Sequence, residues 1–221
     1  MSNAQLYDAS RVRIVALIRA GDPGAPVAAC PGWTAKDLIS HLAGGLGDFL
    51  TRRFEVEEGD DFGERTVRER RDQSVEDALA EWQRHRATAD ELLASPMGGV
   101  LVAEVVSHEH DLRTALGQPG ARDEPGVRAA LERPLQEVDR KRREAGGAAV
   151  RLVVDGATEQ VIGAGEPAAT LRVSAFELLR TISGRRTKDQ VRALDWSVDD
   201  ATPYLPALTM FGEFRDTPLD E

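Results

Sequence analysis

Apolar residues recur every three or four positions through the first part of the chain, up to about residue 116. Such spacing places apolar side chains on one face of a helix and predicts an amphipathic helix wherever it persists. Four helices are predicted here: residues 5–19, a helix that starts at Thr34, residues 75–93, and one between Gly99 and Gly117. Four helices with mostly apolar inner faces suggest a bundle, whose facing helices can hold a metal in the interior.

Capping residues mark where two of these helices start. Thr34 is followed three positions later by Asp37, which resembles a capping box, and Ser74 is a candidate N-cap for the third helix. Residues 55–73 lie between these two starts, are dominated by charge and lack sustained apolar periodicity. We therefore expect a surface loop over residues 55–73.

After residue 147 the pattern changes to short apolar runs separated by turn residues. Strands are predicted over residues 149–154, 159–163 and 169–173, and the Asp-Gly and Gly-Glu-Pro segments between them are typical of hairpin turns. A helix capped by Ser174 is predicted over residues 175–182, followed by one or two further short helices.

The charged segment 127–144 is predicted to form a helix that Pro134 kinks and that connects the two parts of the chain. The expected architecture is multidomain: a four-helix bundle with its connector helix over residues 1–145, and a small α+β domain over residues 146–221.

Composition and charge limit what the chain can bind. The formal net charge of the 221-residue chain is -10 and its isoelectric point is near 5, which argues against a general affinity for nucleic acid or anionic membranes. Cys30 is the one cysteine, so an intramolecular disulfide framework and a cysteine-only zinc site are excluded. No apolar run reaches the length of a membrane span, and the first residues do not resemble a signal peptide. We expect a cytoplasmic protein.

Glu104 is the one polar residue in the apolar run from Val100 to Val106, and His108 follows four positions later. An ionised carboxylate in an apolar interior should reach water, take up a proton or meet a cation. In a helix, side chains four positions apart lie on one face and can reach the same ion. His41, at the edge of the apolar face of the second helix, is the best third ligand, and two histidines with a carboxylate form a known catalytic zinc set. The alternative is a partly exposed Glu-His pair without an ion.

Further polar residues have both functional and structural interpretations. Asp111 lies three positions after His108 and either orients its imidazole or is a surface carboxylate. Arg185 and Arg186 either bind an anion or form a solvent-exposed cluster at a helix end. For four other candidates we expect a structural, exposed or interfacial position: Cys30, Trp33, His85 and His110.

Three segments of the sequence together resemble a known family. They are CPGWTAKDLISHL from Cys30, EVVSHEHDLRTALGQP from Glu104, and FELLRTISGRRTKDQV from Phe176 followed by DWS. In this order they resemble the mycothiol-dependent maleylpyruvate isomerase family over nearly the whole chain. The resemblance implies a DinB-like four-helix metal-binding domain followed by a sterol carrier protein-like α+β domain. It also implies that the metal ligands are His41, Glu104 and His108, with Glu104 where many DinB-like relatives have a third histidine.

The resemblance further implies an enzyme that uses a divalent metal, zinc by preference, with mycothiol as thiol cofactor or cosubstrate. The ion would favour the thiolate of mycothiol, and addition of that thiolate to an alkene would permit rotation before the thiol is eliminated. Two alternatives stay open: a mycothiol S-transferase, and a non-catalytic, metal-stabilised module that holds a small apolar ligand. The expected partners are a small-molecule thiol and an electrophilic substrate, without nucleic acid or membrane.

An acidic protein needs a local cation if it is to bind an acid such as maleylpyruvate. Arg185 and Arg186 follow the predicted helix end at Gly184. We expect one of these guanidinium groups to face a cleft between the domains and to bind a substrate carboxylate through two hydrogen bonds.

Overall fold

The protein is known from a computed structural model, which describes residues 1–55, 61–156, 158–210 and 213–221. The chain divides into two compact units, residues 1–120 together with Glu221, and residues 121–220. As predicted, the first unit is helical and the second combines helices with a sheet. No helix in these ranges is long and apolar enough to cross a membrane.

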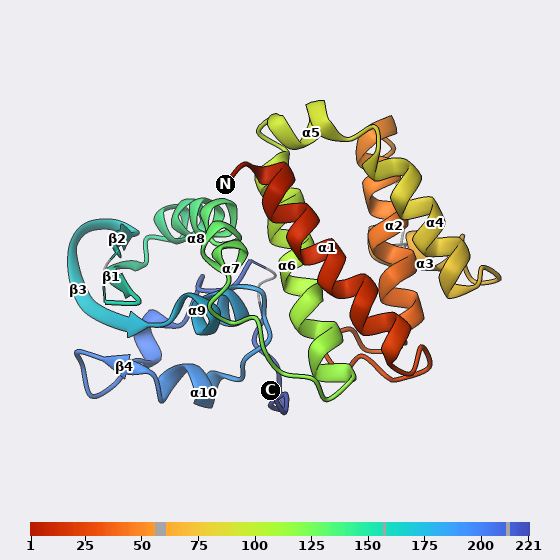
Figure 1. Ribbon diagram of the computed structural model, residues 1–221. Coiled ribbons are helices and arrows are strands. Elements are labelled where there is room, and N and C mark those ends of the chain that lie inside the picture. Colours follow the sequence, from red (N-terminus) through yellow and green to blue (C-terminus); the bar gives the residue numbers. More distant parts are fainter. Residues whose placement is uncertain (56–60, 157, 211–212) are drawn as a thin grey trace. The chain divides into compact units, whose positions relative to one another are not determined.

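The described residues of the first unit form helices and their connections (Figure 1). The helices are α1 (Asn3–Ala20), α2 (Ala35–Thr51), α3 (Phe62–Arg68), α4 (Val75–Arg86), α5 (Asp90–Ala94) and α6 (Gly98–Ala115). The main contacts pair α1 with α6 and α2 with α4, while α2 also touches α3 and α6. The apolar stripes of these helices form a core that excludes solvent, and Ile14, Leu38, Trp82 and Val105 within it are completely buried.

Both predicted capping motifs are present. The Thr34 side chain accepts a hydrogen bond from the backbone of Asp37, whose carboxylate accepts one from the backbone of Thr34. Ser74 and Asp77 form the same reciprocal pair at the start of α4. Because a capping box satisfies amide groups that a helix leaves unpaired at its start, these motifs fix where α2 and α4 begin.

The prediction of a loop over residues 55–73 is wrong for residues 62–68, which form α3. Asp61 caps this helix by accepting hydrogen bonds from the amides of Gly63 and Glu64. With seven residues, α3 is too short to show an apolar period, so its capping residue was the available signal. Residues 56–60 of the expected loop lie outside the described residues.

The helix predicted over residues 75–93 is interrupted, because α4 ends at Arg86 and α5 begins at Asp90. At the break both the amide and the hydroxyl of Thr88 donate to the carbonyl of His85, so this carbonyl has partners although the helix does not continue. Ala89 is nevertheless completely buried, which explains why the apolar pattern continues across the break.

Two glycines of α2 make room for side chains from other segments. A Cβ on Gly44 would lie 2.5 Å from Nη1 of Arg70, and a Cβ on Gly47 would lie 2.7 Å from Nε2 of His85. Real Cβ atoms do not approach so closely, so the glycines allow Arg70 and His85 to cover this face of α2.

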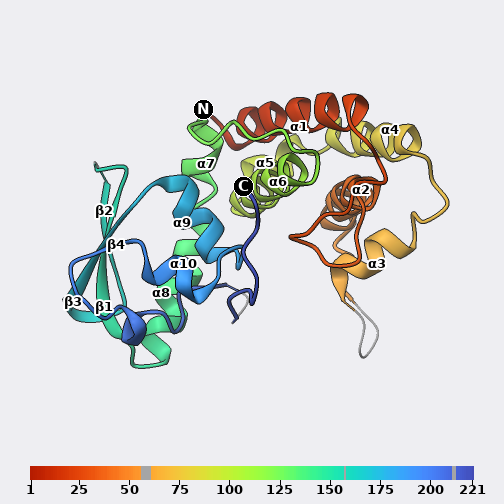
Figure 2. The same cartoon turned by 90° about the horizontal axis from the view of Figure 1, so that it is seen from below.

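The second unit contains a four-stranded sheet of order β2-β1-β3-β4. Its elements are α7 (Pro125–Ala129), α8 (Glu132–Glu144), β1 (Ala148–Val154), β2 (Thr158–Ile162), β3 (Ala164–Val173), α9 (Ala175–Ile182), α10 (Lys188–Arg192), β4 (Asp195–Trp196) and a 3-10 helix (Thr202–Tyr204). Figures 1 and 2 show α8 and α9 on one side of this sheet. Leu152, Ile162, Leu171 and Leu178 are completely buried in its core.

The hairpin expected at Gly165-Glu166-Pro167 is not formed, because these residues lie within β3. β1 and β2 pair antiparallel, as the Asp155-Gly156 turn predicts, but β3 pairs parallel to β1. Ala148 is opposite Ala164 and Val150 is opposite Ala169, so the turn residues are accommodated by a shift in register. β4 then pairs antiparallel with β3.

The segment we expected to connect two domains belongs to the second unit, which starts at residue 121 and not at residue 146. α8 contacts β2 and α9, and its Arg142 is buried. The Arg142 guanidinium donates hydrogen bonds to three carbonyls, those of Ala148, Tyr204 and Pro206. Pro134 does not kink the helix, because it lies in the first turn, where a backbone N–H has no helical partner.

Candidate metal centre

Glu104 lies between two histidines. Its Oε1 is 2.7 Å from Nε2 of His41 and 3.2 Å from Nε2 of His108. The two imidazoles are buried, whereas the side chain of Glu104 is 44% exposed. One ligand atom from each residue lies within 4.8 Å of the others. The structure therefore brings together the three residues that the sequence singled out, from α2 and from one face of α6.

Thr66 determines which nitrogen of His41 faces Glu104. The Thr66 hydroxyl donates to the carbonyl of Gly63 at 2.7 Å, so its oxygen accepts the hydrogen of His41 Nδ1 at 2.9 Å. A neutral His41 then presents the lone pair of Nε2 to Glu104. Thr66 is completely buried in α3, so the helix that the sequence did not reveal orients one of the candidate ligands.

Asp111 has the same effect on His108. Its carboxylate is completely shielded from solvent and accepts a hydrogen bond from Nδ1 of His108 at 3.0 Å. The Cys30 thiol also donates to Asp111, with Sγ 3.9 Å from Oδ2. Cys30, His108 and Asp111 are a second close group of possible ligands, but in this structure they are joined to each other by hydrogen bonds.

The arrangement at Glu104 requires a cation. Each Nδ1 donates its hydrogen to Thr66 or Asp111, so two neutral imidazoles would direct two lone pairs at a carboxylate oxygen, and such a contact is repulsive. Either protons on the Nε2 atoms or a metal ion between the three groups would make it favourable. This donor set fits a divalent metal, since histidine nitrogens and a carboxylate are zinc ligands and the second nitrogen of each histidine is already oriented.

The pKa values of the cluster have the directions expected when protons supply that cation. Burial raises the pKa of Glu104, but the hydrogen bonds and charges of His108 and His41 outweigh it and hold the pKa well below its usual value. Burial lowers the pKa of His108, but hydrogen bonds with Asp111, Cys30 and Glu104 outweigh it and hold the pKa well above its usual value.

A small cavity borders this cluster. Its volume is about 20 Å³, which is close to the space needed for one water molecule. His41 and Glu104 are among its walls, and the other walls are mostly apolar: Leu42, Leu46, Phe49, Phe62, Leu101 and Val105. His41 and Glu104 of the candidate centre therefore face a mostly apolar space.

Comparison with known proteins relates the N-terminal part of the chain to a family. Residues 7–113 match the family model described as the mycothiol maleylpyruvate isomerase N-terminal domain. The N-terminal unit belongs to this family. The match includes all three candidate ligands, and it confirms the family resemblance inferred from the sequence.

Two solved structures related to this family resemble the whole chain. One is a crystal structure of the mycothiol-dependent maleylpyruvate isomerase, with a TM-score of 0.58 and 14% identity; the other is a histidine-to-alanine mutant of that isomerase, with a TM-score of 0.56 and 15% identity. Each match covers 98% of this chain and 95% of the other. They confirm the predicted fold class, a helical domain followed by an α+β domain. No curated protein sequence matches the chain.

Within the maleylpyruvate isomerase-like N-terminal unit, the remaining histidines lie outside the triad. His85 is 31% exposed at its side chain, lies 3.2 Å from Glu81 and packs over Gly47 of α2, so it is only partly solvated. His110, for which we expected an exposed or interfacial position, is 3% exposed and so is buried. α6 is covered on more than one side, and the apolar periodicity of its sequence did not reveal this.

Arg185 and Arg186 lie in the second unit and make hydrogen bonds there. The Arg186 guanidinium is buried and pairs with both carboxylate oxygens of Glu177 at 2.8 Å, while Arg185 donates to the carbonyl of Ser183 at 2.6 Å. The solvent-exposed alternative is therefore wrong for Arg186. A role for either residue in binding a substrate carboxylate stays a prediction.

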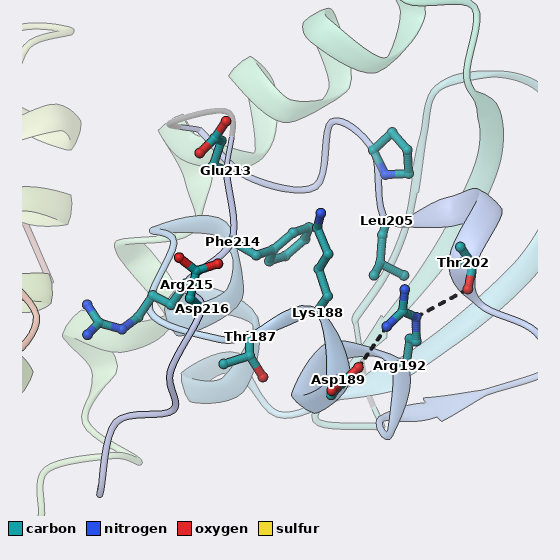
Figure 3. A pocket seen from close by; sticks show the side chains of 11 residues that line it. Thr187, Lys188, Asp189, Arg192, Thr202, Leu205, Glu213, Phe214, Arg215 and Asp216 are labelled. Carbon is teal, nitrogen blue, oxygen red and sulfur yellow. Dashed lines mark hydrogen bonds and ion pairs between the residues drawn. The ribbon is translucent and has the colours of Figure 1, made fainter.

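The second unit also has a larger pocket of about 680 Å³ beside α10, shown in Figure 3. Arg192 lies within it and donates to Asp189 and Thr202. Three cationic and three acidic side chains contribute to its lining: Lys188, Arg192, Arg215, Asp189, Glu213 and Asp216. Arg185 and Arg186 are not part of this lining.

Proposed function

We propose that the chain is a metal-dependent enzyme that activates a low-molecular-weight thiol, mycothiol, for addition to an electrophile. The observation that carries this proposal is the convergence of two Nε2 atoms on Glu104, with both Nδ1 atoms already engaged. Zinc is the ion we propose, although histidine and carboxylate ligands also accept nickel, manganese and iron. A cytoplasmic location, inferred from the sequence, stays a prediction.

The residues of the centre have separate roles in this proposal. His41, Glu104 and His108 would hold the ion and leave a coordination position open. Bound there, a divalent ion would stabilise the thiolate form of a thiol at neutral pH. Thr66 and Asp111 keep the imidazoles in the tautomer that presents Nε2.

The family supports isomerisation as the reaction. Both similar structures are named as mycothiol-dependent maleylpyruvate isomerases. An isomerase would release the thiol after addition to a conjugated alkene, whereas a mycothiol S-transferase would keep it in the product. Product analysis with thiol, metal and a panel of electrophiles separates these two reactions from simple binding.

Metal analysis tests the site directly. The purified protein should hold about one divalent ion per chain, and His41→Ala, Glu104→Ala and His108→Ala should each lose most of it. His85→Ala is the matched control, because His85 is also a helix residue paired with a carboxylate. Full metal content in all three variants would refute the site, and loss in the control alone would mean that the wrong histidine was chosen.

Thiol dependence tests the reaction. Turnover should require added low-molecular-weight thiol and should persist in folded, metal-loaded Cys30→Ser, because the proposed thiol is supplied by solution. Full turnover in thiol-free buffer would contradict the proposal, as would complete inactivity of that variant with normal metal content.

A further inference from the structure

Trp33 contacts both histidines of the candidate centre. Its ring centroid lies 5.0 Å from that of His41 and 6.4 Å from that of His108, and the indole and the His108 ring are inclined by 29°. The two imidazoles are 5.1 Å apart. A single indole therefore lies against both candidate nitrogen ligands.

Residues of α3 fix the position of this indole. Its Nε1 donates to Oε1 of Glu64 at 2.7 Å. A Cβ on Gly63 would lie 3.2 Å from both Cη2 and Cζ2 of Trp33, so the outer edge of the ring packs closely on the backbone there. The short helix that orients His41 through Thr66 thus also holds Trp33.

The backbone of Trp33 is fixed as well. Its amide donates to the carbonyl of Cys30, and its carbonyl accepts a hydrogen bond from the amide of Val27. Thr34, the next residue, caps α2, the helix that carries His41. The indole is therefore held by its hydrogen bond to Glu64, by its packing on Gly63 and by the fixed backbone of Trp33. This reduces the entropy lost when a ligand packs against it.

Trp33 differs from the tryptophan in the helical core. Trp82 is completely buried, and its indole N–H donates to the hydroxyl of Tyr7. Trp33 keeps part of its surface exposed although the two imidazoles beside it are buried. A rigid, partly exposed aromatic ring next to a set of converging polar groups is a common feature of small-molecule sites.

We propose that Trp33 forms one wall of the electrophile-binding site and that the favoured substrates are planar, conjugated acceptors. Their flat π systems can stack on the indole with larger contact than a puckered, saturated molecule achieves. Stacking would also restrict the orientation of the acceptor beside the His41, Glu104 and His108 groups. The substrate class rests on the proposed function, whereas the stacking surface does not require turnover.

Equilibrium binding tests the wall. The zinc-loaded protein is titrated by NMR with benzamide, which is planar and conjugated, and with cyclohexanecarboxamide, which has the same amide on a puckered ring. Trp33→Leu should weaken benzamide binding about three- to tenfold, as expected for loss of an aromatic contact, and should affect cyclohexanecarboxamide less. Trp33→Phe should retain most of the preference.

Trp196→Phe is the matched control, because Trp196 is also partly exposed and donates its indole N–H to a carbonyl. It should leave both affinities unchanged. Metal content is measured in every variant, so that loss of the ion is not mistaken for loss of the wall. Equal affinity of wild type and Trp33→Leu for benzamide, or equal weakening for both amides, would overturn the proposal.

Kinetics then separate the two proposals. With metal and thiol present, Trp33→Leu should lower kcat/KM for the planar, conjugated acceptor trans-cinnamaldehyde more than for iodoacetamide, chiefly through KM. If the wild type converts neither compound, the proposed thiol addition is not supported, and the amide titration still decides whether Trp33 is a binding wall. If both compounds lose activity equally, Trp33 does not select for planarity.

Discussion

At the scale of single residues, the two histidines of the candidate centre have unequal support. A neutral hydroxyl accepts the hydrogen of His41 Nδ1, whereas the buried carboxylate of Asp111 accepts that of His108. A carboxylate both orients an imidazole and makes it a stronger base, while a hydroxyl mainly orients it. We therefore expect His108 to depend more on its partner than His41 does.

Asp111→Asn tests this difference. The variant keeps the shape of the side chain but removes its charge, so metal affinity should fall by about tenfold or more. Competition with a chromophoric chelator measures the affinity. Thr66→Val, the matched change behind His41, should have a smaller effect, and an Asp111→Asn protein with wild-type affinity would show that the carboxylate charge does not act on the centre.

The sequence allowed prediction of which candidate ligands the fold brings together, but of only part of their surroundings. Glu104 and His108 are visible because a helix brings positions four apart together, and Asp111 follows from the same geometry. Thr66 and Glu64 were missed, since they reach His41 and Trp33 from a helix without an apolar stripe. Contacts between segments this distant in the sequence leave no periodic signal.

At the scale of elements, polar contacts hold the segment after α3 against α4. Glu81 of α4 is buried, accepts hydrogen bonds from Arg70 and Gln73, and is 3.2 Å from His85. Burial raises the pKa of Glu81, but these hydrogen bonds and the charge of Arg70 outweigh it and lower the pKa from 4.5 to about 2. The ionised carboxylate therefore helps to join the segment after α3 to α4.

The depressed pKa predicts a specific dependence of stability on pH. A carboxyl whose pKa is lower in the folded state stabilises that state fully above its unfolded pKa, near 4.5, and loses the effect as pH falls through about 2. At pH 7 the free energy of unfolding of Glu81→Gln, measured by urea denaturation, should therefore be lower than that of the wild type by on the order of 2 to 3 kcal/mol. This difference should shrink between pH 4.5 and 2. Glu91→Gln, at an exposed helix position, is the control; a constant difference across this range would contradict the assignment.

At the scale of the whole molecule, the change from helical to strand periodicity revealed two parts but not the boundary between them. α8 has charge on most of its surface, which is typical of a connector, yet it buries Leu135, Val138 and Arg142. The parallel return of β3 was also missed, because the Gly-Glu-Pro segment that usually turns a chain is here accommodated within the strand.

The division into units predicts that the candidate centre is self-contained. The three candidate ligands, Thr66, Asp111 and Trp33 all lie within residues 1–120, which form the body of the first unit. A fragment of residues 1–120 should therefore fold and bind about one metal ion, as measured by circular dichroism and elemental analysis. A folded fragment without metal, beside a full-length protein that holds metal, would show that the second unit contributes to the centre.

The buried guanidinium of Arg142 has a consequence for how the second unit opens. It donates to the carbonyls of Ala148, Tyr204 and Pro206. The neighbouring Lys141 donates to the carbonyl of Met210. If residues 204–210 detached alone, the Arg142 guanidinium would lose two of its three carbonyl acceptors. Leaving such a cation without partners costs far more free energy than losing one exposed contact. Partial unfolding should therefore release α8 and residues 204–210 together, and their amide hydrogens should exchange with solvent as one cooperative group.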